Sequence, residues 1–182
     1  MGSFLIILLL LVIIVGLISV YYVVVYNNYQ EYIIRINEVE SFIDNSIRDK
    51  FDLLSKSINV IKGNIENEED IFPDIVKLRS RKLSSFDLDR QLVDSMNEFY
   101  RIKEEYKELQ KSDAFKEIDT KLKEIEENLT AYKEYYNENI TKYNRLIRNF
   151  PSNIIGKVCK YKEKTFFDGK DMTDEIDNDF KL

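Results

Sequence analysis

The chain has 182 residues, of which only 5 are glycine and 2 are proline, while 33% are charged. So few turn-forming residues predict few connections and long helices. The chain contains no histidine, the most common general base and metal ligand, and its net charge of −6 argues against a nucleic-acid binder, which needs a basic face. The single cysteine, Cys159, cannot form an internal disulfide.

Residues 4–25 form an uncharged apolar run, FLIILLLLVIIVGLISVYYVVV. As a helix this run would be about 33 Å long, enough to cross a hydrocarbon core of about 30 Å. A cleaved signal peptide would need a basic start and small residues at the cleavage site. Tyrosines occupy the end of the run instead, as in an interfacial aromatic belt. We therefore expect a short stub (1–3) and an uncleaved transmembrane helix over residues 4–26.

Basic residues set the expected orientation of this helix. None precedes the apolar run, whereas Arg35, Arg48 and Lys50 follow it. The positive-inside rule therefore favours an external N-terminus and a cytoplasmic C-terminal domain.

The helical pattern continues beyond the membrane. No glycine or proline lies between Leu17 and Lys62, so the first helix can run unbroken into a domain. Apolar side chains recur every three or four residues and mark one buried face. They are Ile36, Val39, Ile43, Ile47, Phe51, Leu54, Ile58, Ile61 and Ile65.

Two further helices follow from the same kind of pattern. Pro73 suits the first turn of a second helix that runs to about residue 110, with Ser84 or Ser85 capping a restart within it. Ser112 or Asp113 should cap a third helix that runs to about residue 150. The apolar positions of this third helix are Phe115, Ile118, Leu122, Ile125, Leu129, Tyr132, Tyr136, Ile140, Tyr143, Ile147 and Phe150.

Helices of similar length, each about 55 Å, with short connections favour an antiparallel bundle with coiled-coil packing. Starting at the membrane, the chain would run out, back and out again, so Pro151 would lie at the far tip. Proline disfavours helix at the residue before it, and Ser152 or Asn153 can cap a short fourth helix that folds back. We therefore predict an all-α fold in which the transmembrane helix continues into an up-down-up bundle over residues 27–165. Residues 166–182 are acidic and should form a flexible tail.

No residue pattern points to catalysis. Acidic pairs such as Glu104 and Glu105 fit a solvated helix face, since a di-iron bundle would need histidine. The acids of the tail lack the order of an EF-hand loop, and Cys159 has neither a histidine nor a second cysteine to activate it. We therefore expect no enzymatic activity and no catalytic, cofactor-binding or metal-binding residue.

Residues 131–156 carry three elements of a known pattern: Tyr135-Tyr136-Asn137, Tyr143-Asn144 and Phe150-Pro151-Ser152-Asn153-Ile154. Together they resemble the C-terminal signature of the LemA family. Residues 47–63 and 104–115 are similar to the first-helix pattern and the turn of that family.

Two departures from the family pattern concern turn geometry, because Ser55 and Lys107 stand where the family usually has proline. The resemblance implies an antiparallel helical bundle, LemA-like over residues 27–165, on a bacterial cell membrane. It supplies no established activity. The signature residues that it implies to be structural are Tyr136, Asn137, Tyr143, Asn144, Phe150, Pro151, Ser152 and Asn153.

One basic cluster is left without a role in this scheme. It consists of Lys157, Lys160, Lys162 and Lys164 together with Tyr161. In an up-down-up bundle it would lie about 50 Å from the membrane, far beyond the Debye length of about 8 Å. Attraction to lipid is then excluded, and we expect either a docking site for an acidic partner protein or a solubilising rim.

Two functions fit these expectations. The first is a non-enzymatic, single-pass membrane scaffold or regulator that docks a membrane-associated partner protein. The alternative is a structural protein that self-assembles with further copies of the chain and shapes the membrane.

Overall fold

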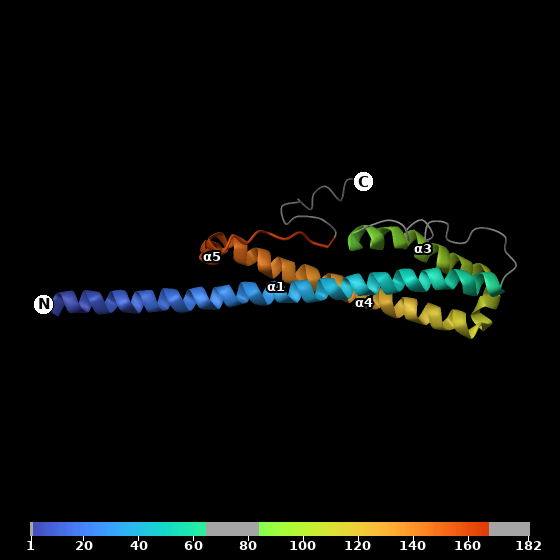
Figure 1. Cartoon of the computed structure of the whole chain (residues 1–182), viewed down its shortest axis with the longest axis horizontal. Coiled ribbons are helices and arrows are strands. Elements are labelled where there is room, and N and C mark those ends of the chain that lie inside the picture. Colours follow the sequence, from blue (N-terminus) through green and yellow to red (C-terminus); the bar gives the residue numbers. More distant parts are fainter. Residues whose placement is uncertain (1, 65–83, 168–182) are drawn as a thin grey trace. The chain divides into compact units, whose positions relative to one another are not determined.

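The computed structural model describes residues 2–64 and 84–167 (Figure 1). These ranges contain the helices α1 (Gly2–Asn64), α3 (Ser85–Glu105), α4 (Asp113–Arg148) and α5 (Ser152–Val158), and the 3-10 helix η1 (Lys107–Lys111). No strand occurs in the described residues. The chain divides into two compact units: unit 1 comprises Met1–Glu38 and Tyr136–Leu182, and unit 2 comprises Val39–Tyr135. The all-α class is confirmed, as is the long N-terminal helix that continues into a helical bundle.

Helix α1 changes character along its length while remaining one unbroken helix. Its first part is apolar and exposed, and an 18-residue window there, none of it buried, is long and apolar enough to be a candidate membrane span. From Val25 onward one face becomes buried, as the spacing of apolar residues predicts. The buried residues of this face are Val25, Tyr29, Ile36, Val39, Ile43, Ile47, Leu54 and Ile61.

In unit 2, α4 runs antiparallel to both α1 and α3. Along α1, Phe42 stacks near Tyr132 with 5.6 Å between ring centroids, and the later Lys50 reaches the earlier Glu126 at 2.6 Å. Along α3, Lys133 pairs with Asp89 near the start of the helix, whereas the Phe99 ring stacks on Phe115, near the start of α4. Helices α1 and α3 therefore point the same way.

This order of directions differs from the expected up-down-up course, because the third long helix returns along α1. The expected start of the second helix, residues 73–83, lies outside the described residues. The proposed restart is confirmed: Ser84 is the N-cap of α3, and its Oγ accepts a hydrogen bond of 3.2 Å from the Asp87 amide.

A buried lysine joins α1, α3 and α4 in unit 2. Lys50 on α1 is only 2% exposed and pairs with Glu126 of α4 at 2.6 Å, while Asp89 of α3 lies 3.8 Å away. Asp89 also pairs with Lys133 of α4. A buried charge needs such partners, so these pairs bind α1, α3 and α4 in one register.

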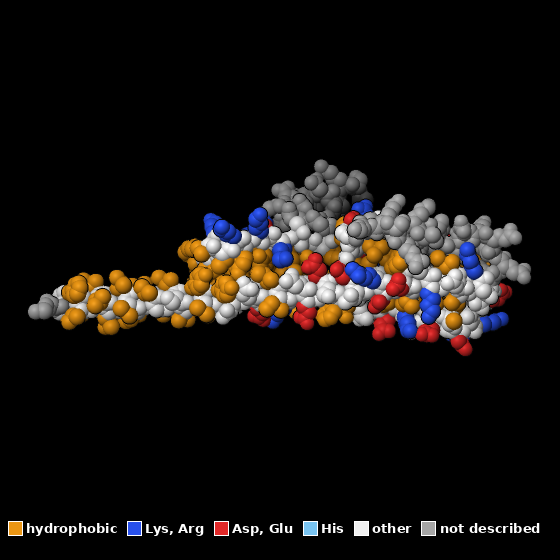
Figure 2. Space-filling model, in the orientation of Figure 1, with side chains coloured by type: hydrophobic (Ala, Val, Ile, Leu, Met, Phe, Trp, Pro, Cys, Tyr) orange, Lys and Arg blue, Asp and Glu red, His pale blue; other side chains and the backbone are white. Residues whose placement is uncertain are grey.

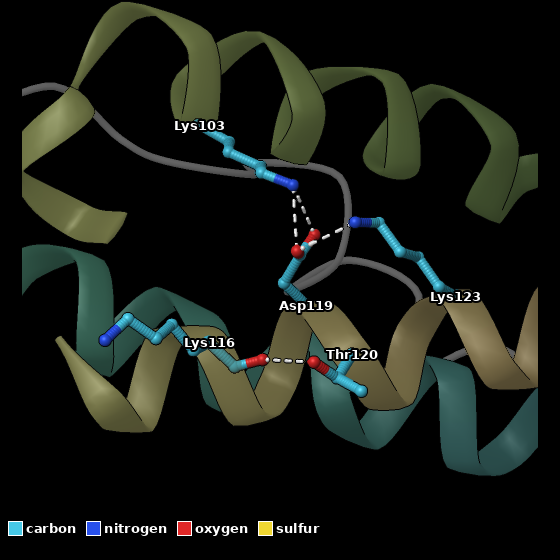
Figure 3. A network of polar contacts seen from close by, with 5 residues as sticks. All are labelled: Lys103, Lys116, Asp119, Thr120 and Lys123. Atoms are coloured by element: carbon cyan, nitrogen blue, oxygen red, sulfur yellow. Dashed lines mark hydrogen bonds and ion pairs between the residues drawn. The ribbon is translucent and has the colours of Figure 1, made fainter. Parts of the chain in front are cut away.

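A second polar cluster links α3 to α4 (Figure 3). Lys103 of α3 donates hydrogen bonds of 2.9 and 2.8 Å to the two carboxylate oxygens of Asp119, and Lys123 donates a third of 3.1 Å. Burial alone would raise the pKa of Asp119, but the hydrogen bonds from these lysines outweigh it and hold that pKa below its usual range. Thr120, which donates to the Lys116 carbonyl, faces away from this cluster (Figure 3).

In unit 1 the end of α4 packs against the part of α1 that follows the apolar run. The core of this unit contains Val25, Tyr29 and Ile36 of α1 together with Ile140 and Tyr143 of α4 and Ile155 of α5. The expected position of Pro151, at a tip far from the candidate span, is therefore wrong. Helix α5 packs beside the residues that directly follow the apolar run (Figure 1).

We predict that Asp119→Asn lowers the free energy of unfolding by about 1–3 kcal/mol at neutral pH, because Lys103 loses a largely buried charged partner. Since folding depresses the pKa of Asp119, its contribution is present above the unfolded pKa of about 3.9 and is lost as the pH falls through the folded pKa. Urea unfolding in detergent, followed by circular dichroism, should show the two proteins converging as the pH falls below about 4.

The matched control is Glu117→Gln on the same helix. Glu117 pairs with Lys121 at 2.6 Å, but its side chain is 61% exposed, against 14% for Asp119. Loss of this exposed pair should lower the free energy of unfolding much less than loss of Asp119 does. Equal losses for the two variants would contradict a stabilising role for the Asp119 cluster.

Candidate functional site

The turn between α4 and α5 is held by Ser152. Its hydroxyl lies 2.7 Å from the Leu146 carbonyl oxygen and 2.9 Å from that of Asn149, and it donates to these two groups at the end of α4. Helix α5 begins after Pro151 with no side-chain cap. The expectation that Ser152 or Asn153 caps the fourth helix is therefore wrong, because the serine satisfies carbonyls of the preceding helix.

Tyr29 is the centre of the contact between α1 and α5. Its ring is fully buried, lies edge-on to Tyr143 with 5.8 Å between centroids, and is tilted against Tyr161 at 4.9 Å. Its hydroxyl donates to the Ser152 carbonyl at 3.3 Å, and burial raises the pKa of Tyr29 to about 12. A Cβ atom on Gly156 would lie 2.7 Å from that hydroxyl. Only glycine at 156 allows this approach.

Two asparagines of α4 hold the extended segment that follows α5. Asn144 is fully buried; its Nδ2 donates to the Lys164 carbonyl at 2.7 Å and its Oδ1 accepts from the Lys164 amide at 2.9 Å. Asn137 Oδ1 accepts from the Phe167 amide at 2.9 Å. The asparagines are two helical turns apart, about 10 Å, and three residues of extended chain span about the same distance. The two side chains thus form a clamp on residues 164–167.

Further side chains reinforce this arrangement. Gln30 Nε2 donates to the Tyr161 hydroxyl at 2.5 Å, and Arg148 donates to both carboxylate oxygens of Glu163 at 2.9 and 2.6 Å. The Tyr22 hydroxyl lies 3.8 Å from Cys159 Sγ. These contacts attach residues 159–163 to α1 and α4.

All eight signature residues lie in unit 1, where they have different structural roles. Asn137 and Asn144 form the clamp, Tyr143 packs on Tyr29, Ser152 ends α4, and Tyr136 lies edge-on to Phe167 with 6.3 Å between centroids. Pro151 is the N-cap of α5, and Asn153 donates its amide to the Asn149 carbonyl at 2.8 Å. Phe150, expected in the core, is 79% exposed.

The candidate docking residues differ in exposure. Lys157, Lys160 and Lys162 are exposed, but Tyr161 packs against the core of unit 1 and the backbone of Lys164 is held by the clamp. Their position also differs from the expected one, because Lys157 belongs to α5 and the others follow it, and α5 packs beside the end of the apolar run. Within residues 2–64 and 84–167, no three histidine, cysteine, aspartate or glutamate side chains gather as metal ligands would.

Sequence reasoning missed Tyr29 and Gly156. The tyrosines at and just after the end of the apolar run suggest an aromatic belt, but Tyr29 among them is buried in protein. Gly156 stands inside a short apolar helix, and an isolated glycine there is a known sign of close approach.

We predict that Asn144→Ala frees residues 161–167, because the Lys164 amide and carbonyl lose their partners. Trypsin cleavage of the folded chain at Lys162 and Lys164 should rise on the order of tenfold, as expected for about 1–2 kcal/mol of lost local stability. Asn128→Ala, at an exposed position of the same helix, should leave cleavage unchanged. Unaltered cleavage of the Asn144 variant would contradict the clamp.

We predict that Gly156→Ala destabilises the chain by about 1–3 kcal/mol through overpacking against Tyr29. Tyr29→Phe removes the clashing oxygen, and the next ring atom then lies at an ordinary 3.4 Å. The double variant should therefore unfold at a higher temperature than the sum of the single effects predicts. Gly63→Ala, which meets no atom within 4 Å, is the control. Strict additivity would show that the two residues do not touch.

Comparison with known proteins identifies the family of the chain. The model of the LemA family matches residues 39–180 of the chain. No curated protein matches it. Since the matched region covers most of the sequence and includes all eight signature residues, the chain belongs to the LemA family.

Proposed function

We propose that this chain is a single-pass membrane scaffold. Residues 4–26 cross the bilayer, and the bundle, facing the cytoplasm of a bacterial cell, binds a membrane-associated partner protein without catalysing a reaction. One observation carries the anchor: the last turns of the apolar run belong to the folded domain. Val25 is 5% exposed in the core of unit 1, and Tyr22 reaches Cys159. Cleavage after the run would remove Val25 from that core and would also remove Tyr22 with its contact to Cys159.

The scaffold role is supported by the side-chain contacts that hold each unit in one arrangement. In unit 1 the asparagine clamp fixes the backbone of the extended segment that follows α5. In unit 2 the Lys50 pairs fix the register of the three helices. A binding surface that is ordered before its partner arrives loses little entropy on binding. The exposed Val93 of α3, which shares an open groove with Arg90 and Asp94, is one place for such a contact.

The anchor is tested by the mass of the mature protein. We expect the chain recovered from membranes to retain residues 4–26 and to resist extraction with alkaline carbonate. In a Val93→Cys/Cys159→Ser variant, an impermeant maleimide should label position 93 only after lysis. A mature chain that starts beyond residue 26 would overturn the anchor, and labelling in intact cells would overturn the orientation.

The scaffold role is tested with a photo-crosslinking amino acid at Val93. We expect an adduct with a protein that leaves the membrane when this chain is deleted. The intact chain should restore that protein to the membrane, whereas Val93→Asp should not. An adduct of two copies of the chain, with no other protein displaced, would contradict the scaffold and favour self-assembly.

A further inference from the structure

We infer that residues 150–160 form a second, interfacial contact with the bilayer that recognises anionic lipid headgroups. The interfacial face consists of Phe150, Ile154 and Val158 with Lys157 and Lys160. The inference rests on the proposed anchor, because the end of the apolar run defines the level of the membrane surface.

The position of α5 along α1 is the first step. Cys159, directly after α5, lies 3.8 Å from the hydroxyl of Tyr22, a residue inside the expected span. Ile155 of α5 shares a core with Val25 at the end of that span. If residues 4–26 cross the hydrocarbon, α5 is held where the hydrocarbon meets the headgroups.

The exposed side of α5 is apolar, which is the second step. Phe150, Ile154 and Val158 are spaced four residues apart and are 79%, 53% and 67% exposed. Phe150 lies in the turn before α5, whereas Ile154 and Val158 lie on α5. The packing face of α5 is a different one, because Ile155 and Gly156 are buried against the core that contains Tyr29. Figure 2 shows hydrophobic side chains on the projecting N-terminal part of α1 and again over α5. An exposed apolar face beside a span fits insertion into the interface.

Charge gives the third step. Residues 150–167 contain four lysines and one acidic residue, Glu163, in a chain whose net charge is −6. Glu163 is paired with Arg148, which leaves the exposed Lys157 and Lys160 beside the apolar face. Figure 2 shows Lys and Arg side chains at the border of the hydrophobic region over α5. Basic side chains at this depth attract anionic headgroups.

The backbone at Lys160 supports a role for its side chain. Lys160 has φ 58°, in the left-handed region where glycine is favoured after a helix. A lysine at this position accepts a conformational cost that glycine would avoid, which is common at functional sites.

The chain contains no tryptophan, so a single one can report its own surroundings. We propose to place Phe150→Trp, Tyr21→Trp and Val93→Trp separately in the full chain, reconstituted in nanodiscs of phosphatidylcholine with or without phosphatidylglycerol. Lipids brominated on their acyl chains quench a tryptophan that contacts them. With anionic lipid, Phe150→Trp should be quenched about as much as Tyr21→Trp, and Val93→Trp should not be quenched.

A lysine near an anionic surface contributes roughly a fivefold change in binding. In the Phe150→Trp background, Lys157→Gln/Lys160→Gln should therefore lower the ratio of membrane-bound to free conformers of the interfacial face about 25-fold. The matched control is Lys107→Gln/Lys111→Gln, which alters two exposed lysines of η1 and should change nothing.

The outcomes separate this inference from the anchor. If Tyr21→Trp is quenched but Phe150→Trp is not, the anchor stands and the interfacial contact is wrong. Absence of quenching at Tyr21→Trp would overturn the anchor itself. Equal quenching at Phe150→Trp in neutral and anionic discs would overturn headgroup recognition. If Phe150→Trp is shielded from solvent in native membranes but is not quenched in pure lipid, the face binds a protein and the inference is overturned.

Discussion

The contact of Tyr29 with the turn after α4 is the constraint on which unit 1 depends. Its ring fills the space between α1, Tyr143 and Tyr161, and its hydroxyl occupies the place that a side chain at residue 156 would need. Because Tyr29 lies one helical turn beyond Val25, this contact brings the end of α4 and all of α5 to the end of the apolar run. The asparagine clamp on residues 164–167 then follows along the same stretch of α4.

This position of α5 changes which ligand the basic cluster can be expected to bind. At a tip remote from the bilayer, four lysines would suggest a protein ligand, since charge cannot act on lipid across several Debye lengths. Beside Tyr22 and Val25, the exposed lysines and the apolar side chains of α5 instead resemble an interfacial helix. The span and α5 would then fix the domain at two points, which restrains rotation about α1 more than a single span does.

Sequence periodicity predicted the helices well and their neighbours poorly. The apolar stripe of α1, the cap at Ser84 and the stop before Pro151 all depend on local geometry, which a short stretch of sequence contains. The apolar face of a helix, however, can pack on a parallel or an antiparallel helix equally well. The spacing of apolar residues therefore could not give the relative directions of the helices. Phe150 kept the spacing of the stripe but lies beyond the end of α4 at Arg148, and it is exposed as a result. Ser152 could reach either helix at the turn, and only the fold shows that it serves α4. The family signature marked the right residues without revealing that two of them, Asn137 and Asn144, hold residues 164–167.

The central claim is that the Pro151 end of α4 lies beside the end of the apolar run. Tyr22→Cys, combined with the native Cys159, tests it directly through a short bismaleimide in the full chain, diluted in detergent. Peptide mapping should recover residues 22 and 159 joined within one chain, because the Tyr22 hydroxyl and Cys159 Sγ are 3.8 Å apart. The competing pair is Tyr22→Cys with Ser112→Cys in a Cys159→Ser background, and it should not react. Linkage of 22 to 112 in place of 159 would contradict the account.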